Sequence, residues 1–297
     1  MAVTPDSTAV GFIGLGIMGQ SMAGHILDAG YRLNVFNRSR EKAAALIERG
    51  AVWCDTPGDV AANSAVVITI IGTPADVEEV YLGAGGLVQR AQPGAILIDM
   101  TTSSPSLARR IAEVAEAKGI AVLDAPVSGG DAGAKSGKLS IMVGGPEAAF
   151  AAVRPLFDVM GANIVLQGGP GAGQHTKMCN QIAIASTVMA VSESLAYAKA
   201  AGLDPQRVLS SIGAGAAASF QLTVLGPKML DGDYRAGFYV HHFFKDMSIA
   251  LAEAESMKLD LPGLVQAKRL FQKLIDEGHA QDGTQALFRL YDPTAEQ

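Results

Sequence analysis

Lys177 has the best spacing for proton chemistry in this chain. It lies one helical turn before Asn180, in a segment that runs from Gly171 to Gln181. Residues three or four apart on a helix share a face, so this segment groups an ammonium with carboxamides. An ammonium beside a carbonyl oxygen stabilises a developing alkoxide and then supplies its proton. The spacing therefore indicates an acid/base lysine, although a lone helix lysine is more often only solvated.

A second motif, near the start of the chain, has the spacing of a dinucleotide-binding loop. It follows the apolar run 9–13, opens a helical pattern, and consists of Gly14, Leu15, Gly16, Ile17, Met18 and Gly19. The first glycine allows a tight turn, the second lets backbone N–H groups approach a pyrophosphate, and the third permits close helix–strand packing. The helix N-terminus adds partial positive charge. Such a cofactor would supply a hydride to a carbonyl that Lys177 protonates.

The residues after the second expected strand bear on the choice of cofactor. Sites for NAD usually have an Asp or Glu there, whereas this chain has Asn37, Arg38 and Ser39, with no acid before Glu41. Arg38 can pair with a 2′-phosphate, and Asn37 and Ser39 can donate hydrogen bonds to it. NADP is therefore the preferred prediction and NAD stays open. Alternatively, Arg38 and Arg40 only decorate the start of a helix.

The first half of the chain alternates β-rich runs with helical patterns, as a parallel sheet with crossover helices does. We expect strands at 9–13, 32–36, 65–71, 95–98, 120–123, 139–143 and 163–166. Helices are expected between them at 18–28, 41–48, 107–118 and 147–160, and then at 174–201, 205–212, 244–257, 264–277 and 285–291. The pattern predicts an α/β, Rossmann-type, doubly wound domain over 1–168. An all-α domain over 169–297 would begin with a long interdomain helix.

Composition argues against several other classes of protein. The formal net charge is −6 and no Lys/Arg run occurs, so we expect no nucleic-acid binding. The two cysteines make neither a metal spacing nor a disulfide framework, which fits a reducing cytosol. His241 and His242 are adjacent and should point apart, so no metal site is expected. Residues 1–8 carry no secretory signal and the apolar segment 182–201 contains charges, which predicts a cytoplasmic protein without a membrane span.

Five short motifs together resemble the β-hydroxyacid dehydrogenase family, a 6-phosphogluconate dehydrogenase-like group. It includes 3-hydroxyisobutyrate dehydrogenases, tartronate semialdehyde reductases and glyoxylate/succinic semialdehyde reductases. The motifs are Gly14–Gly19 with Met22-Ala23, Asp99–Pro105, Asp124–Gly130, Gly171-x-Gly173 through Lys177 and Asn180, and Lys245-Asp246-Met247. They span nearly the whole chain, in order and at sensible intervals, so coincidence is negligible.

The resemblance implies a role for each matching residue. Lys177 would be the catalytic acid/base, Thr102 would lie beside the nicotinamide, and Lys245 would reach the cofactor from the helical domain. The substrate would be bound by Ser128, Gly129, Gly130, Asn180 and Gln181, where Gln181 stands at a position that often has a second Asn. Independently of the family, a serine before two glycines could form an anion-binding nest, or only an ordinary turn.

Two further positions need comment. Ile71 and Gly72 match a turn that contacts the cofactor, but the family often has a proline where this chain has Gly72, which puts the stiffness of the turn in doubt. Asp246 next to Lys245 suits a surface ion pair on a helix, so we expect it to have a structural role.

We therefore expect an NADP-preferring oxidoreductase that interconverts a small hydroxy acid and its semialdehyde, as a homodimer or homotetramer. The small substrate would carry a carboxylate. An imine reductase on the same scaffold is a first alternative, and Lys177 argues against it because relatives with that chemistry usually lack the lysine. A non-catalytic NADP-binding module is a second alternative, and the presence of Ser128, Lys177 and Asn180 argues against it.

Overall fold

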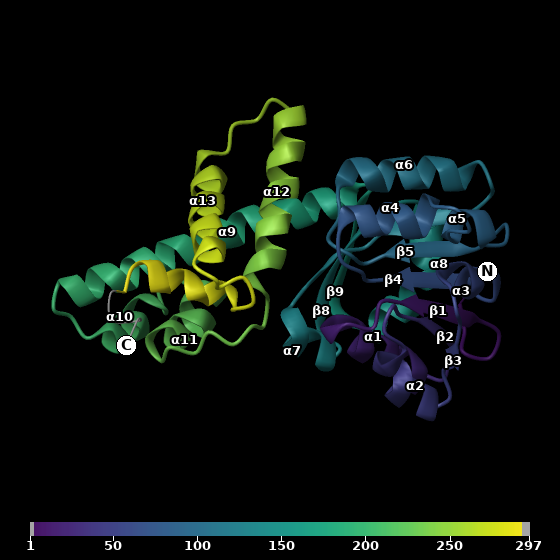
Figure 1. Ribbon diagram of the computed structural model, residues 1–297, viewed down its shortest axis with the longest axis horizontal. Helices are drawn as coiled ribbons and strands as arrows, with labels where there is room; N and C mark the ends of the chain where they lie inside the picture. The colour runs from purple at the N-terminus through teal and green to yellow at the C-terminus, as the bar shows by residue number, and fades with distance from the viewer. Residues whose placement is uncertain (1–2, 293–297) are drawn as a thin grey trace. The chain divides into compact units, whose positions relative to one another are not determined.

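The computed structural model describes residues 3–292, and its contacts divide the chain into an N-terminal unit, 1–177, and a C-terminal unit, 178–297 (Figure 1). The outermost residues of the two predicted domains, 1–2 and 293–297, lie outside the described residues. The N-terminal unit is a Rossmann-type α/β fold and the C-terminal unit is helical, which confirms the predicted fold class. The boundary predicted at 168–169 stays a prediction, because helix α9 (Ala172–Ala200) runs from one unit into the other.

Within the described residues of the N-terminal unit, a nine-stranded sheet forms the centre, with the order β3-β2-β1-β4-β5-β6-β8-β7 and β9 paired to β8. Its strands are β1 (Ala9–Ile13), β2 (Arg32–Phe36), β3 (Val52–Trp53), β4 (Val66–Thr69), β5 (Ile96–Asp99), β6 (Ala121–Asp124), β7 (Val127–Ser128), β8 (Leu139–Gly144) and β9 (Gly161–Gly168). The order reverses between β1 and β4. In doubly wound sheets, ligands bind at such a switch point, beside the carboxyl ends of the strands.

Apolar residues on both faces of the sheet are buried, because successive strand residues enter different cores. Phe12 and Ile68 belong to a core that contains residues of α1 (Ile17–Asp28) and α8 (Glu147–Asp158). Ile13 and Val67 belong to a core that contains residues of α3 (Pro57–Ala62), α4 (Pro74–Leu82), α5 (Leu87–Arg90) and α6 (Pro105–Glu116). Figure 1 shows α1 on one side of the sheet and α4 and α6 on the other. Two buried faces explain the continuous apolar runs in the sequence.

The central strands end in register, which sets the loops after them side by side. Ile13 pairs with Phe36 on one side and with Thr69 on the other. Thr69 pairs in turn with Asp99, and Asp99 with Asp124. The predicted cofactor loop, the turn after β2, the Ile71-Gly72 turn and the Thr102 loop therefore all leave the same edge of the sheet. These loops lie together because the strands before them pair in parallel, and not because of the sequence of any one loop.

The C-terminal unit contains most of α9 and the helices that pack with it. They are α10 (Pro205–Ile212), η2 (Gln221–Leu225), α11 (Gly226–Leu230), α12 (Val240–Ser256), α13 (Pro262–Asp276) and η3 (Thr284–Leu290). Their core includes Phe243 and Phe271, whose rings meet edge to face with centroids 5.1 Å apart. Among the described residues, no helix is long and apolar enough to cross a membrane.

The structure corrects the predicted elements in a few places. The helix expected at 41–48 starts as the 3-10 turn η1 (Arg40–Ala43) before α2 (Ala44–Glu48), and the helix expected at 285–291 is the 3-10 segment η3. The short α3 and α4 were not expected, although each has Pro at its first position after a capping threonine. The short α7 (Gly130–Lys135) was also missed. Strand β8 runs antiparallel to β6 and β7, which a purely parallel series does not predict.

Candidate active site

Each of the three glycines in the loop Gly14–Gly19 is required for a different structural reason. Gly14 has φ +98°, and a Cβ there would lie 2.1 Å from the Ile70 carbonyl oxygen. A Cβ at Gly19 would lie 1.8 Å from the Gly14 carbonyl oxygen, so this position needs glycine for packing. A Cβ at Gly16 would meet nothing within 4 Å. Gly16 thus faces open space at the start of α1, where no side chain caps the helix, and this fits a pyrophosphate at that terminus.

The side chain of Asn37 supports this loop from the turn after β2. Its Oδ1 accepts a hydrogen bond from the Leu15 N–H at 2.9 Å, and its Nδ2 donates one to the Ser39 carbonyl at 2.9 Å. Both ends of the amide are therefore engaged inside the protein. The two arginines of this turn differ. Arg40 lies over the Trp53 ring, 5.3 Å from its centroid, whereas Arg38 is exposed and its Nη1 lies 3.4 Å from Asp76 Oδ1.

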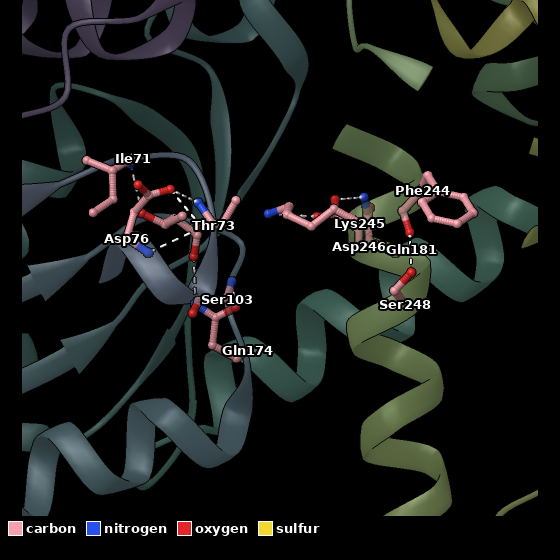
Figure 2. Close-up of polar contacts among 11 residues, drawn as sticks. Ile71, Thr73, Asp76, Ser103, Gln174, Gln181, Phe244, Lys245, Asp246 and Ser248 are labelled. Carbon is pink, nitrogen blue, oxygen red and sulfur yellow. Dashed lines mark hydrogen bonds and ion pairs between the residues drawn. The ribbon is translucent and has the colours of Figure 1, made fainter. Parts of the chain in front are cut away.

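Asp76 also fixes the turn in which glycine replaces the family's proline. Its Oδ2 accepts hydrogen bonds from the Thr73 N–H at 2.8 Å and the Thr73 hydroxyl at 2.7 Å, as the capping box of α4 (Figure 2). A Cβ at Gly72 would lie 2.7 Å from this same oxygen. Gly72 therefore leaves room for the Asp76 carboxylate, and the capping box fixes the backbone at the start of α4.

A chain of hydrogen bonds joins the turn after β4 to the loop after β5. Asp99 Oδ1 accepts from the Thr69 hydroxyl at 2.9 Å and from the Thr101 N–H at 3.1 Å. The Thr101 hydroxyl in turn accepts from the Ile71 N–H at 2.9 Å. Burial raises the pKa of Asp99 to about 6, against the lowering effect of its hydrogen bonds, and the nearby Asp124 carboxylate raises it further. The two predicted cofactor loops thus share one buried carboxyl group.

The first turn of α9 is fastened to the same region. Asp124, at the end of β6, accepts from the Gly171 N–H and from the Gln174 N–H, each at 2.7 Å. The Gln174 amide then accepts from the Ser103 N–H at 2.9 Å (Figure 2) and donates to the Thr101 carbonyl at 2.7 Å. Burial raises the pKa of Asp124 to about 6, and the backbone N–H groups that it accepts from oppose that rise.

Lys177 follows one turn later on α9 and is buried, with 6% of its surface exposed. The N-terminal unit also holds the half-buried Thr102 and Ser128. After Ser128, Gly129 and Gly130 have φ +132° and +62°, which side-chain-bearing residues rarely adopt. Two successive left-handed glycines are compatible with the predicted anion-binding turn.

In the C-terminal unit, the three predicted residues belong to one relay of polar contacts. Asn180 Nδ2 donates to Gln181 Oε1 at 2.7 Å, and Gln181 Nε2 donates to Asp246 Oδ2 at 2.6 Å. Lys245 Nζ lies 3.1 Å from Asp246 Oδ1 (Figure 2). Asp246 is 1% exposed, so the expected surface ion pair is wrong as to its place. The pair is buried because Asp246 lies on the inner face of α12, where the Gln181 amide also donates a hydrogen bond to its carboxylate.

The two adjacent histidines at the start of α12 do not point apart as expected. The centroids of the His241 and His242 rings lie 4.1 Å apart, and the His241 Nδ1 makes a hydrogen bond to the Ala280 carbonyl at 2.8 Å. Burial, with His241 and Lys245 nearby, lowers the pKa of His242 to about 4. Among residues 3–292 no group of three or more His, Cys, Asp or Glu side chains could hold a metal ion.

Several residues that organise the site were not predicted from the sequence. They are Asp76, Asp99, Thr101, Asp124 and Gln174. Two of them had a recognisable signal, since Asp99 and Asp124 each end an apolar run, as a residue at the carboxyl end of a buried parallel strand does. Thr101 and Gln174 lie within two of the family motifs but have no local signal of the contacts that they make, and Asp76 has the sequence context of an ordinary helix cap.

Both parts of the chain match models of known protein families. Residues 9–169 match the NAD-binding domain of 6-phosphogluconate dehydrogenase, and residues 171–291 match the NAD-binding domain of NADP-dependent 3-hydroxyisobutyrate dehydrogenase. An uncharacterised oxidoreductase of Bacillus subtilis is 54% identical over 95% of this chain and 98% of its own. The 2-hydroxy-3-oxopropionate reductase of Escherichia coli is 40% identical over 92% of this chain and 93% of its own.

Solved structures agree with the sequence matches. The 3-hydroxyisobutyrate dehydrogenase of Mycobacterium tuberculosis, in a structure with L-serine, is 28% identical, with a TM-score of 0.88 over 95% of this chain and 98% of that one. An imine reductase from Pseudomonas is 20% identical with a TM-score of 0.62 over 96% and 99%, a likeness of fold alone. Both halves of the chain, matched over nearly their full length, identify it as a member of the β-hydroxyacid dehydrogenase family of oxidoreductases.

Proposed function

We propose that this protein is an NADP-preferring oxidoreductase that interconverts a small hydroxy acid and its semialdehyde, with Lys177 as the general acid/base. The observation that carries the proposal is the position of Lys177. It is 6% exposed, one turn beyond a helix start that bonds directly to Thr101 and Ser103, the neighbours of Thr102. A buried lysine one turn from the loop that we assign to the nicotinamide suits proton transfer better than a solvated one.

The chain has the parts that a dinucleotide requires. Backbone N–H groups at Gly16 and the open start of α1 would hold the pyrophosphate, and the loops at Ile71 and Thr102 would flank the nicotinamide. When bound, the cofactor supplies a hydride to the carbonyl carbon, or takes one from the alcohol in the reverse direction. Lys177 would donate a proton to the carbonyl oxygen in reduction, and as a neutral amine would accept the hydroxyl proton in oxidation.

The preference for NADP rests on Arg38. Its guanidinium is exposed at the end of β2, and the turn carries no carboxylate of its own before Glu41. Arginine pairs bidentately with phosphate, whereas a carboxylate in the turn after β2 would repel the 2′-phosphate. The family description that matches residues 171–291, which names an NADP-dependent enzyme, points the same way.

We assign the substrate carboxylate to the turn at Ser128, Gly129 and Gly130. The left-handed glycines and the hydroxyl are suited to an anion, and the name 2-hydroxy-3-oxopropionate reductase describes an acid that carries an aldehyde. We keep Asn180 and Gln181 as substrate-orienting amides and Lys245 as a contact to the cofactor. Assembly as a homodimer or homotetramer and a cytoplasmic location stay predictions.

The test is a panel of small semialdehydes and hydroxy acids, each assayed with NADPH/NADP⁺ and NADH/NAD⁺, together with Lys177→Ala. We expect turnover of at least one semialdehyde, and loss of about 10³-fold or more of kcat in Lys177→Ala. NADPH affinity, measured by fluorescence titration, should change little. Lys118→Ala, at an exposed position, is the control and should behave as the unaltered enzyme.

Three results would contradict the proposal. Turnover retained in Lys177→Ala would remove the lysine from the chemistry. Reduction of a cyclic imine without reduction of any semialdehyde would favour an imine reductase, and NADPH binding with no turnover of the whole panel would favour a non-catalytic module.

A further inference from the structure

We propose that Gln174 is a positioning residue, which fixes the nicotinamide-side loop at Thr102 relative to Lys177. The inference rests on the proposed function, since it takes Lys177 as the proton donor and Thr102 as a neighbour of the nicotinamide. It concerns a residue that touches neither reacting group. Gln174 acts through the two backbone segments that it holds together.

The side chain of Gln174 bonds to the backbone on both sides of Thr102. Its Nε2 donates to the carbonyl of Thr101 at 2.7 Å. Its Oε1 accepts from the N–H of Ser103 at 2.9 Å (Figure 2). The side chain is fully buried, at 0% exposure. An amide has one donor end and one acceptor end, which this pair of backbone groups requires. A carboxylate or an apolar side chain of the same size can satisfy at most one of them.

The backbone of Gln174 is held independently of its side chain. Its N–H donates to Asp124 Oδ2 at 2.7 Å, and the neighbouring Gly171 N–H donates to Asp124 Oδ1 at 2.7 Å. A Cβ at Gly173 would lie 2.4 Å from the carbonyl oxygens of Asp124 and Met142, so the helix start packs directly on strand backbone. The first turn of α9 therefore has a fixed place at the edge of the sheet, and the Gln174 side chain extends that anchor to the Thr102 loop.

The spacing along α9 connects this anchor to the proton donor. Lys177 lies three residues after Gln174 in the same uninterrupted helix, which is a rise of about 4.5 Å. Helical side chains leave the axis tilted toward the N-terminus, so the stem of Lys177 starts over the turn that contains Gln174. One buried side chain thus sets the separation between the loop that would flank the hydride donor and the residue that would deliver the proton.

This arrangement predicts a particular kinetic pattern. When reacting groups are misplaced by about 1 Å, the chemical step slows by roughly 10²-fold while ground-state binding changes little. If Gln174 were purely structural, its replacement would lower the stability of the protein without slowing the enzyme that remains folded. Three measurements therefore distinguish a positioning role from a structural one. They are the separate effects on kcat and KM, the isotope effect and the pH profile.

The experiment compares Gln174→Met with Gln285→Met. Gln285 is a matched control because it is 2% exposed and its Nε2 donates to the carbonyls of Asp233 and Arg235 at 2.9 and 3.0 Å, in the C-terminal unit. We expect kcat to fall roughly 10- to 100-fold in Gln174→Met, with KM for NADPH and semialdehyde within about threefold. The isotope effect with 4-deuterated NADPH should rise, because hydride transfer becomes slower than product release. Gln285→Met should lower Tm and leave kcat unchanged.

A second variant, Gln174→Glu, tests the same contact independently. It keeps the inference testable even if Gln174→Met does not fold. A protonated carboxyl group can donate to the Thr101 carbonyl and accept from the Ser103 N–H, whereas a carboxylate can only accept. The kcat of Gln174→Glu, relative to the unaltered enzyme at each pH, should therefore be highest at acid pH and fall as the new carboxyl group ionises. The Gln174→Met variant should show no such dependence.

The outcomes distinguish this inference from the proposed function. If Gln174→Met keeps full kcat and isotope effect while Lys177→Ala is inactive, the positioning role is wrong and the proposed function stands. If Lys177→Ala keeps its turnover, the proposed function itself fails. A Gln174→Glu variant with a flat relative pH profile would also overturn the positioning role.

Discussion

The Arg38 guanidinium lies 3.4 Å from the Asp76 carboxylate, although 83% of the Arg38 side chain is exposed. The arginine that we assign to the cofactor phosphate is thus joined to the residue that caps α4. A salt bridge this exposed adds little to stability. Its consequence is electrostatic, because the Asp76 carboxylate competes with a cofactor phosphate for the Arg38 guanidinium.

Replacing Arg38 should change the choice of cofactor. In Arg38→Ala we expect Kd for NADPH to rise about tenfold or more, since hydrogen bonds to charged groups contribute about 1.5–3 kcal/mol, while Kd for NADH changes less than threefold. Isothermal titration with both cofactors measures the difference. Arg40→Ala is the matched control, because Arg40 lies over Trp53 and should affect NADPH and NADH alike. An equal loss for both cofactors in Arg38→Ala would remove the phosphate assignment.

Neutralising Asp76 should have the opposite effect. The Asp76→Asn variant keeps an acceptor for the Thr73 N–H but removes a negative charge beside Arg38. We expect KM for NADPH to fall about two- to fivefold at low salt and the gain to shrink as salt rises, because an exposed charge is screened. KM for NADH should stay constant. A rise in KM for NADPH would mean that Asp76 orients Arg38 more than it competes for it.

Asp99 should make stability depend on pH in a defined direction. Its pKa in the folded protein is about 6, above the ordinary 3.8. The folded state therefore binds the extra proton, so this contribution to stability is full below about pH 4 and is lost as pH rises through 6. Asn carries no such proton. The Tm of Asp99→Asn minus that of the unaltered protein should increase from pH 4.5 to 7.5, by the equivalent of roughly 1–3 kcal/mol. A difference that is constant or falls with pH would contradict this pKa.

The glycines of the cofactor loop should separate binding from folding. Gly16→Ala adds a methyl group to open space, so we expect an unchanged Tm and NADPH binding weakened by about tenfold or more, since the methyl group would occupy the approach of the pyrophosphate. Gly19→Ala instead sets a Cβ 1.8 Å from the Gly14 carbonyl oxygen and should lower Tm strongly. Thermal melts with and without NADPH test both. Unchanged NADPH binding in Gly16→Ala would contradict the assignment of the loop.

The sequence alone determined the features that depend on local pattern. Apolar, β-rich runs bounded by turn residues predicted the central strands. The expected ranges 9–13, 32–36 and 205–212 agree with the structure at both ends. The glycine loop was recognisable because its three roles are set within six residues. Short elements such as α3 and α4 were missed, since one or two helical turns carry too little periodicity to distinguish from a loop.

Only the tertiary structure decided how the candidate site is held together. Asn37 bonds to Leu15 across 22 residues, and Gln174 bonds to Thr101 across 73. No local propensity encodes such contacts. They exist because parallel pairing aligns the ends of β1, β4, β5 and β6 at one edge, where Asp99 and Asp124 become buried and their pKa values rise. The sequence identified Lys177 from its spacing on a helix. The place of that helix start is set by the hydrogen bonds that the Asp124 carboxylate accepts from the N–H groups of Gly171 and Gln174, which lie far from Asp124 in the chain and next to it in the fold.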